Sequence, residues 1–173
     1  MNAQIPGTAD QAQAMQLQQK MQLAARARSG TDWFFWIAGL SLINSVAYAL
    51  GANFAFVIGL GITQVTDYLA REFAAQVGSS GTLVRVIGFI FALVVAGIFA
   101  VFGLLGRKGS RVAVVIGMVL YALDAVLLVI AQDWLSVAFH AWGLFGIFTG
   151  LRAMGQLEAL DRPPGSDVIQ TLD

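Results

Sequence analysis

The sequence predicts an all-α integral membrane protein with four transmembrane helices and an outer-side segment between the first and the second. Of its 173 residues, 58% are hydrophobic and only 12% are charged, and the mean hydropathy is +0.75. These values lie outside the range of soluble domains. Four apolar runs approach the roughly 20 residues that a helix needs to cross a bilayer. Most basic residues lie in the segments that four crossings would place on one side of the membrane, as is typical of a membrane protein with one fixed orientation.

Residues 1–30 are predicted to form a cytoplasmic tail that contains an amphipathic helix. The run 11–28 consists of good helix formers and becomes basic toward its end. Such a helix is either a docking arm close to acidic lipid headgroups or a solvated helical tail. Its basic residues are Lys20, Arg26 and Arg28.

The first crossing is expected at 33–50. Residues 29–31 should end the preceding helix, and Asp32 can cap the next one. The aromatic run 33–36 is typical of a membrane–water interface. Within the crossing, four polar residues fall on one helical face, which should be turned away from lipid. They are Ser41, Asn44, Ser45 and Tyr48.

The outer segment, 51–82, is the ambiguous part of the chain. Its apolar run, 54–62, is too short to cross a membrane alone. The segment is therefore either a helix lying in the interface or a re-entrant segment that turns near Gly59 and Gly61. An ion pair at i, i+4 spacing is expected between Asp67 and Arg71. The polar residues singled out here are Gln64, Asp67, Arg71 and Arg85.

Three further crossings are expected at 83–105, 112–131 and 135–151. With the first they make a four-helix membrane domain, residues 31–155, followed by a cytoplasmic tail at 156–173. Small residues recur on the second and fourth crossings, where they let another helix backbone approach closely. These residues are Ala92, Ala96, Ala100, Gly103, Gly143, Gly146 and Gly150.

The orientation follows from the distribution of basic residues. With four crossings, most of them gather on one side of the membrane, which the positive-inside rule assigns to the cytoplasm. We therefore expect a multi-pass protein of the plasma (inner) membrane with both termini and the loop around Arg107 in the cytoplasm. Only Arg71 and Arg85 fall on the other side.

A polar layer is expected inside the bundle. Asp124 and His140 lie within the third and fourth crossings, at a depth similar to that of Asn44 on the first. Because the turn between these two crossings is short, a hydrogen bond between Asp124 and His140 is easily formed. An unpaired carboxylate there costs about 2.5 to 3.5 kcal/mol on insertion scales, so Asp124 must be protonated, paired or hydrated. Tyr48 and Tyr121 are further candidate partners.

The polar layer has two interpretations. In the first it is a proton or ligand site, and in the second it is a set of polar contacts that hold the helices in register. The first function hypothesis is an accessory, scaffold or interaction subunit that binds another membrane protein or a second copy of itself. The alternative is an oligomeric proton-linked transporter or channel for small solutes that uses Asp124 and His140.

Other function classes are not expected. Ten basic and ten acidic residues cancel, so no large field attracts nucleic acid. The chain has no cysteine and one histidine, and no catalytic motif is present, so a membrane enzyme is only the third hypothesis, and we predict no metal site and no cofactor. The expected partners are the lipid bilayer and another membrane protein or a homo-oligomer.

Overall fold

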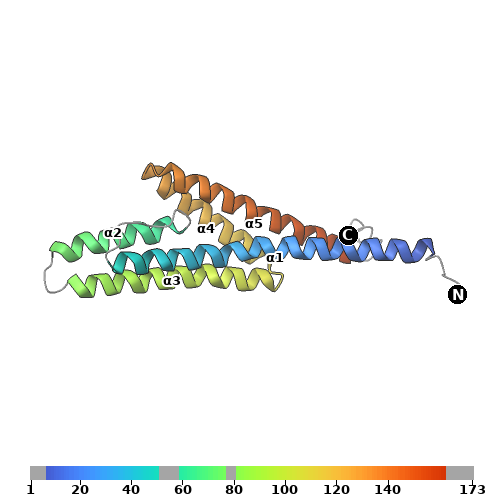
Figure 1. Ribbon diagram of the computed structural model, residues 1–173, viewed down its shortest axis with the longest axis horizontal. Helices are drawn as coiled ribbons and strands as arrows, with labels where there is room; N and C mark the ends of the chain where they lie inside the picture. Colours follow the sequence, from blue (N-terminus) through green and yellow to red (C-terminus); the bar gives the residue numbers. More distant parts are fainter. Residues whose placement is uncertain (1–6, 51–58, 77–80, 163–173) are drawn as a thin grey trace, which may run out of the picture.

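A computed structural model describes residues 7–50, 59–76 and 81–162, which form five helices and no strands (Figure 1). The prediction of an all-helical protein is confirmed for these residues. Three of the helices, α3, α4 and α5, are long and apolar enough to cross a membrane, which indicates a membrane protein. The helices are α1 (Thr8–Ala49), α2 (Gly61–Gln76), α3 (Gly81–Arg107), α4 (Arg111–Ile130) and α5 (Trp134–Asp161).

Helix α1 is the longest helix of the described residues and packs against three of the others. It packs along α3 and against α5, while α4 pairs with α5 and α2 packs on α3, α1 and α4. Figure 1 shows the N-terminal part of α1 projecting beyond the other helices, and the short α2 lying beside its C-terminal half. The two ends of α1 therefore have different surroundings, the first exposed and the second enclosed by helices.

The predicted break between the N-terminal helix and the first crossing is wrong, because α1 runs without interruption through residues 29–31. Gly30 is in backbone contact with α5, where a Cβ atom on Gly30 would lie 2.5 Å from Cα of Gly150. Asp32 caps no helix and instead forms an ion pair with Arg107 at 2.6 Å. Packing against two neighbouring helices thus outweighs the weak helix propensity of this stretch.

The aromatic run at the start of the predicted first crossing is divided between the core and the surface. Phe34 is fully buried and packs against Phe99 and Phe102. Trp33 lies against Gly146 of α5, whereas Trp36 remains 66% exposed. Of these aromatic side chains, Trp36 is therefore the one available to a membrane interface.

The ends of the three apolar helices are close to the predicted crossings, except at the end of α5. Ser110 caps α4 by accepting a hydrogen bond from the N–H of Ala113, and Asp133 caps α5 by accepting one from the N–H of Ser136. Helix α5 continues to Asp161, beyond the expected end near residue 151. The start of the predicted C-terminal tail is therefore helical.

The small residues pack against other helices of the same chain. A Cβ atom on Gly103 would lie 2.8 Å from the ring of Phe35, and one on Gly150 would lie 2.6 Å from Cα of Gly30. Ala92 and Ala96 are buried as well. These small residues therefore let helices of the same chain, α1 among them, pack closely against α3 and α5.

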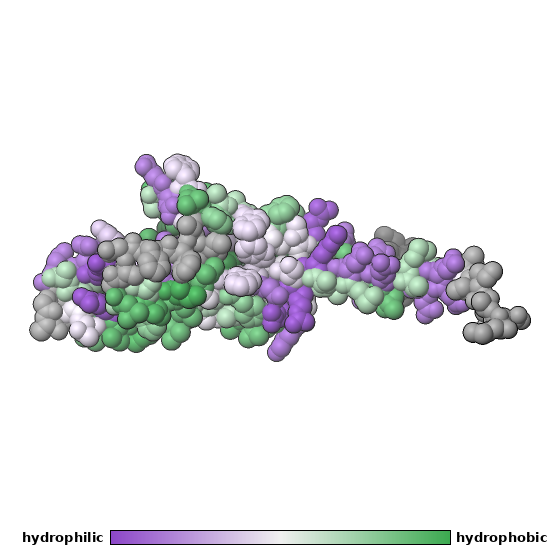
Figure 2. All heavy atoms as spheres, in the orientation of Figure 1, coloured by the Kyte–Doolittle hydropathy of each residue, from purple (hydrophilic) through white to green (hydrophobic). Residues whose placement is uncertain are grey.

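Large apolar side chains cover the outside of the bundle. Figure 2 shows an apolar surface over α3, and hydrophilic side chains around its end and on the projecting part of α1. Most of the exposed large side chains of α3 and α4 are aliphatic, as expected for helices surrounded by lipid. The second half of α1 is less apolar because it carries the polar face that includes Ser41, Asn44 and Ser45.

Candidate functional site

Asp124 and His140 meet in the interior between α4 and α5. Nε2 of His140 lies 3.0 Å from Oδ2 of Asp124. The histidine is fully buried and the aspartate is 6% exposed. The contact expected from the short turn between the two helices is therefore present, and both groups are buried.

The second ring nitrogen of His140 restricts where protons can lie. Nδ1 is 2.9 Å from the backbone carbonyl oxygen of Ser136, and a carbonyl only accepts, so Nδ1 carries a proton and donates. With Nδ1 protonated, a hydrogen bond between Nε2 and Oδ2 requires one further proton on one of these two atoms. The pair is either an imidazolium with a carboxylate or a neutral imidazole with a carboxylic acid, and its net charge is zero in both cases.

Asp124 also binds the first turn of α2. Its Oδ2 accepts a hydrogen bond from the backbone N–H of Gly61 at 2.7 Å, and its Oδ1 accepts one from Ile62 at 2.8 Å. The first N–H groups of a helix have no partner within the helix and carry the positive end of its dipole. A side chain of α4 therefore acts as the cap of α2.

A second side chain extends this cap from the opposite side. The backbone N–H of Leu60 donates to Oγ of Ser41 on α1 at 2.7 Å, and the Ser41 hydroxyl in turn donates to the carbonyl of Ile37. Both Leu60 and Ser41 are fully buried. Three consecutive amide groups, those of residues 60–62, thus receive acceptors from α1 and α4.

Two of the other predicted partners also lie in this interior region. The ring of Tyr121 stacks on the imidazole of His140 with a centroid distance of 4.3 Å. The Tyr121 hydroxyl is buried and has no hydrogen-bond partner within the described residues. Asn44 is buried beside the start of α2, where a Cβ atom on Gly59 would lie 2.8 Å from its Nδ2.

Tyr48 belongs to a separate cavity of about 230 Å³ near the C-terminal end of α1. Here Ser45 donates to Oδ2 of Asp67 at 2.5 Å, and the guanidinium of Arg71 lies 5.9 Å from the centre of the Tyr48 ring. Arg85 lines the same cavity and forms no ion pair within the described part of the chain. Asp67, Arg71 and Arg85 therefore form a polar group of their own, apart from the Asp124 and His140 pair.

The predicted ion pair between Asp67 and Arg71 is not among those formed by the described residues. Asp67 is turned toward α1, where it is buried and accepts the hydrogen bond of Ser45. The i, i+4 spacing brings the Asp67 and Arg71 side chains near each other. A buried carboxylate such as that of Asp67 is nevertheless stabilised more by a buried donor such as Ser45 than by an exposed cation. Gln64 is half-buried, and its Nε2 lacks a partner within the described residues.

The sequence reasoning missed the backbone amides of residues 60–62 and their acceptor Ser41. A signal was present, because α2 follows an apolar stretch with no Ser, Thr, Asp or Asn directly before its first residue. A helix without a cap of its own needs an acceptor from elsewhere if its start is buried. An aspartate within an apolar helix is a suitable candidate for that acceptor.

The side chains of this site can hold a proton and can bind the N-terminus of a helix. Within residues 7–50, 59–76 and 81–162, no group of three or more His, Cys, Asp or Glu side chains is placed to hold a metal ion. No protein-family model, curated protein or solved structure matches the chain.

Proposed function

We propose that this chain is a four-crossing membrane protein that works as an accessory, scaffold or interaction subunit. Helix α1 makes the fourth crossing beside α3, α4 and α5. The supporting observation is that the carboxylate of Asp124 has both oxygens engaged in holding α2 and His140. A group so engaged stabilises an arrangement of helices, which is what a subunit that acts through its shape requires.

The position of α2 is part of this proposal. Its first turn is enclosed by Ser41 of α1 and Asp124 of α4, and Leu60 is fully buried. A helix lying in the interface would have its start in contact with water, so these contacts favour a re-entrant half-helix. Non-helical backbone inside the membrane is tolerated where other parts of the protein satisfy its hydrogen bonds. The predicted turn near Gly59 and Gly61 is described, whereas residues 51–58 of the predicted outer segment lie outside the described residues.

The orientation is proposed from the charges. Arg107 and Arg111 flank the connection between α3 and α4, and Lys20, Arg26 and Arg28 lie on the N-terminal half of α1. The positive-inside rule assigns both groups to the cytoplasm. The protein then lies in the plasma (inner) membrane, with both termini on the cytoplasmic side.

A groove of about 380 Å³ between α2, α3 and α4 is the surface on which we place the partner. Apart from Asp124, its lining side chains are apolar, among them Ile62, Ile98 and Leu123. We propose a transmembrane helix of another membrane protein as the occupant, because the groove is apolar and lies on α3 and α4, which are long and apolar enough to cross a membrane.

Photo-crosslinking in native membranes tests the interaction. A benzophenone side chain replaces Leu123, which is 59% exposed in the groove, or Phe145, which is 65% exposed on α5 and does not line the groove. We expect a protein adduct of one defined mass from position 123 only. Lipid adducts alone at both positions, or the same protein adducts at both, would contradict the proposal.

The alternative function is a proton-linked transporter or channel that is active as an oligomer. The observation in its favour is the 3.0 Å contact between Nε2 of His140 and Oδ2 of Asp124, beside the first N–H groups of α2. Buried ionisable pairs of this kind serve as proton relays in other membrane proteins.

Flux measurements separate the two functions. The purified wild-type chain and its Asp124→Asn variant are reconstituted into vesicles that contain a pH-sensitive dye. The accessory function predicts no proton flux above that of empty vesicles for either protein. Flux in the wild type that the substitution abolishes would establish the transporter instead.

A further inference from the structure

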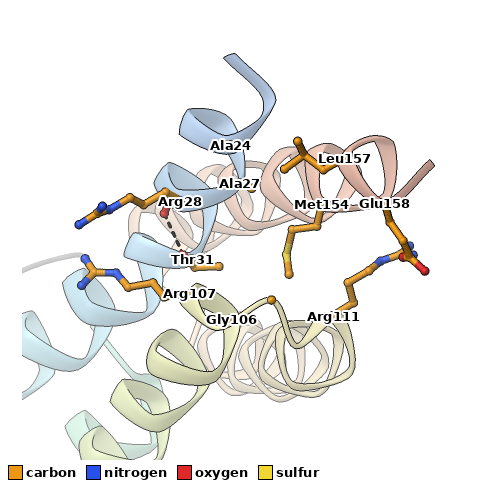
Figure 3. A pocket seen from close by; sticks show the side chains of 11 residues that line it. Ala24, Ala27, Arg28, Thr31, Gly106, Arg107, Arg111, Met154, Leu157 and Glu158 are labelled. Carbon is orange, nitrogen blue, oxygen red and sulfur yellow. Dashed lines mark hydrogen bonds and ion pairs between the residues drawn. The ribbon is translucent and has the colours of Figure 1, made fainter. Parts of the chain in front are cut away.

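Two cavities lie at the two ends of α3. The larger one, of about 580 Å³, lies beside the connection between α3 and α4 (Figure 3). Figure 3 shows Arg28 and Arg107 extending away from it and Arg111 turned to Glu158, with which Arg111 forms an ion pair at 3.0 Å. The other lining residues are nearly all apolar, so this cavity offers few polar groups to a ligand.

The smaller cavity, of about 230 Å³, is polar and lies where α1 ends and α3 begins. Three helices surround it. Its polar lining consists of Ser45 and Tyr48 from α1, Asp67 and Arg71 from α2, and Arg85 from α3. The volume is below the range of about 300 to 1,000 Å³ that is usual for ligand pockets, which limits this cavity to small molecules.

Asp67 gives the smaller cavity a buried carboxylate. The residue is 9% exposed, and its Oδ2 accepts the hydrogen bond of Ser45, which is 1% exposed. Its other oxygen, Oδ1, accepts no hydrogen bond within the described residues, and it is not among their buried atoms without a partner. Oδ1 is therefore accessible from the cavity and can accept a hydrogen bond from a ligand.

The two arginines of this cavity have no carboxylate partner. Neither forms an ion pair within the described residues, and the neighbouring stretches 51–58 and 77–80 contain no Asp or Glu. The guanidinium of Arg71 lies 5.9 Å from the centre of the Tyr48 ring, and this ring also lines the cavity. The charged end of Arg71 is therefore at the cavity wall.

Arg85 adds a second positive charge from the first turns of α3. The exposed side chains next to it on this helix, Leu83, Val86 and Ile87, are aliphatic. A guanidinium is costly among lipid-facing side chains, and the cavity that Arg85 lines is the polar region beside it. With Asp67 ionised, the cavity combines one negative charge with two positive charges.

We propose that the smaller cavity binds an acidic amino acid such as aspartate. At neutral pH this molecule carries two carboxylates and one ammonium group, which is the opposite of the side-chain charges around the cavity. Its ammonium group donates to Oδ1 of Asp67, and its carboxylates accept from Arg71 and Arg85. The cavity is separate from the groove assigned to a partner helix, so either proposal can fail without the other.

Isothermal titration calorimetry on the full chain in neutral detergent tests this site with three probes. Aspartate has all three charged groups, succinate lacks the ammonium group, and asparagine lacks the second carboxylate. We expect aspartate to bind about tenfold more tightly than either of the others, since each of them loses a charge-assisted hydrogen bond. Absence of aspartate binding, or equal affinities for aspartate and either other probe, would overturn the proposal.

The variant Asp67→Asn tests the contact with the ammonium group. It should bind succinate about as the wild type does, and its preference for aspartate over succinate should disappear. A purely structural role of Asp67 would weaken both probes by the same factor. A preference for aspartate that persists in this variant would refute the assignment of Oδ1.

The variant Arg85→Gln tests the second carboxylate contact, and because Arg85 is exposed, the substitution should leave the fold intact. It should lose the preference for aspartate over asparagine. The matched control is Arg152→Gln, because Arg152 is exposed on α5 and does not line this cavity. The control should bind aspartate as the wild type does. Equal aspartate affinities in these two variants, at equal thermal midpoints, would contradict the proposal.

Discussion

Oδ2 of Asp124 on α4 accepts a hydrogen bond from the backbone N–H of Gly61, the first residue of α2, at 2.7 Å and across 63 positions of sequence. The same oxygen contacts Nε2 of His140 on α5. One carboxylate thus joins three helices. Its loss should therefore affect the start of α2 more than it affects α4, the helix to which it belongs.

Asp124→Asn should lower the stability of the protein and release the first turn of α2. The amide has one acceptor oxygen, so one of the two N–H groups of residues 61 and 62 is left without a partner. An unsatisfied buried donor costs about 1 to 3 kcal/mol. Unfolding in detergent measures the stability, and hydrogen exchange at residues 60–62 measures the release.

The control for this substitution is Asp161→Asn, because Asp161 lies in an exposed ion pair with Lys20. Exposed ion pairs contribute little, so this variant should behave as the wild type. Unchanged stability and unchanged exchange in Asp124→Asn would show that the carboxylate does not hold α2.

Gly150→Ala should separate α1 from α5. The new Cβ atom would lie 2.6 Å from Cα of Gly30, and neither backbone can yield without moving its helix. Overpacking of this kind costs about 1 to 3 kcal/mol, measured as the free energy of unfolding in detergent. Gly97→Ala is the matched control, since no atom lies within 4 Å of its Cβ position. A loss of stability as large in Gly97→Ala would contradict the packing argument.

The contact between the end of α5 and the start of α4 should weaken in acid. Hydrogen bonds first from Arg111 and then from Arg162 lower the pKa of Glu158 below its ordinary value of 4.5. A carboxyl group with a lower pKa in the folded state stabilises that state fully above the unfolded pKa, and this contribution disappears as the pH falls through the folded pKa.

The measurement is the thermal midpoint as a function of pH. The thermal midpoint of the wild type should decrease below pH 4.5, and in Glu158→Gln the part of this decrease that comes from Glu158 should be missing. The difference between the two midpoints should be small, because the ion pair of Glu158 with Arg111 is exposed. The comparison variant is Glu72→Gln, which removes a carboxyl group that forms no ion pair within the described residues. Identical pH profiles for wild type and Glu158→Gln would refute the contribution of this contact.

The four-crossing topology can be tested by labelling single cysteines, because the native chain has none. A membrane-impermeant maleimide should label Gln13→Cys and Lys108→Cys from the cytoplasmic side and Gln132→Cys from the other side. Labelling of positions 13 and 108 from opposite sides would show that α1 does not cross the membrane. Labelling of position 108 from outside would reverse the orientation.

Much of the fold follows from local properties of the sequence. The lengths of the apolar runs predict α3, α4 and α5, and the short turn between α4 and α5 places Asp124 opposite His140. Each of these features depends on residues that are close along the chain. Helical period and hydrophobic length act over one or two elements, so they can be recognised without knowing the rest of the fold.

Other features were decided by contacts between distant residues. The sequence alone predicted a break near Gly30, but the backbone of Gly150 on α5 packs there and α1 continues. The sequence also placed a carboxylate inside a membrane helix without showing what it binds. Its partners are amide groups at the start of α2, and every residue carries the same N–H group. Only the tertiary arrangement determines which of them remain unsatisfied within a helix and lie within reach of Asp124.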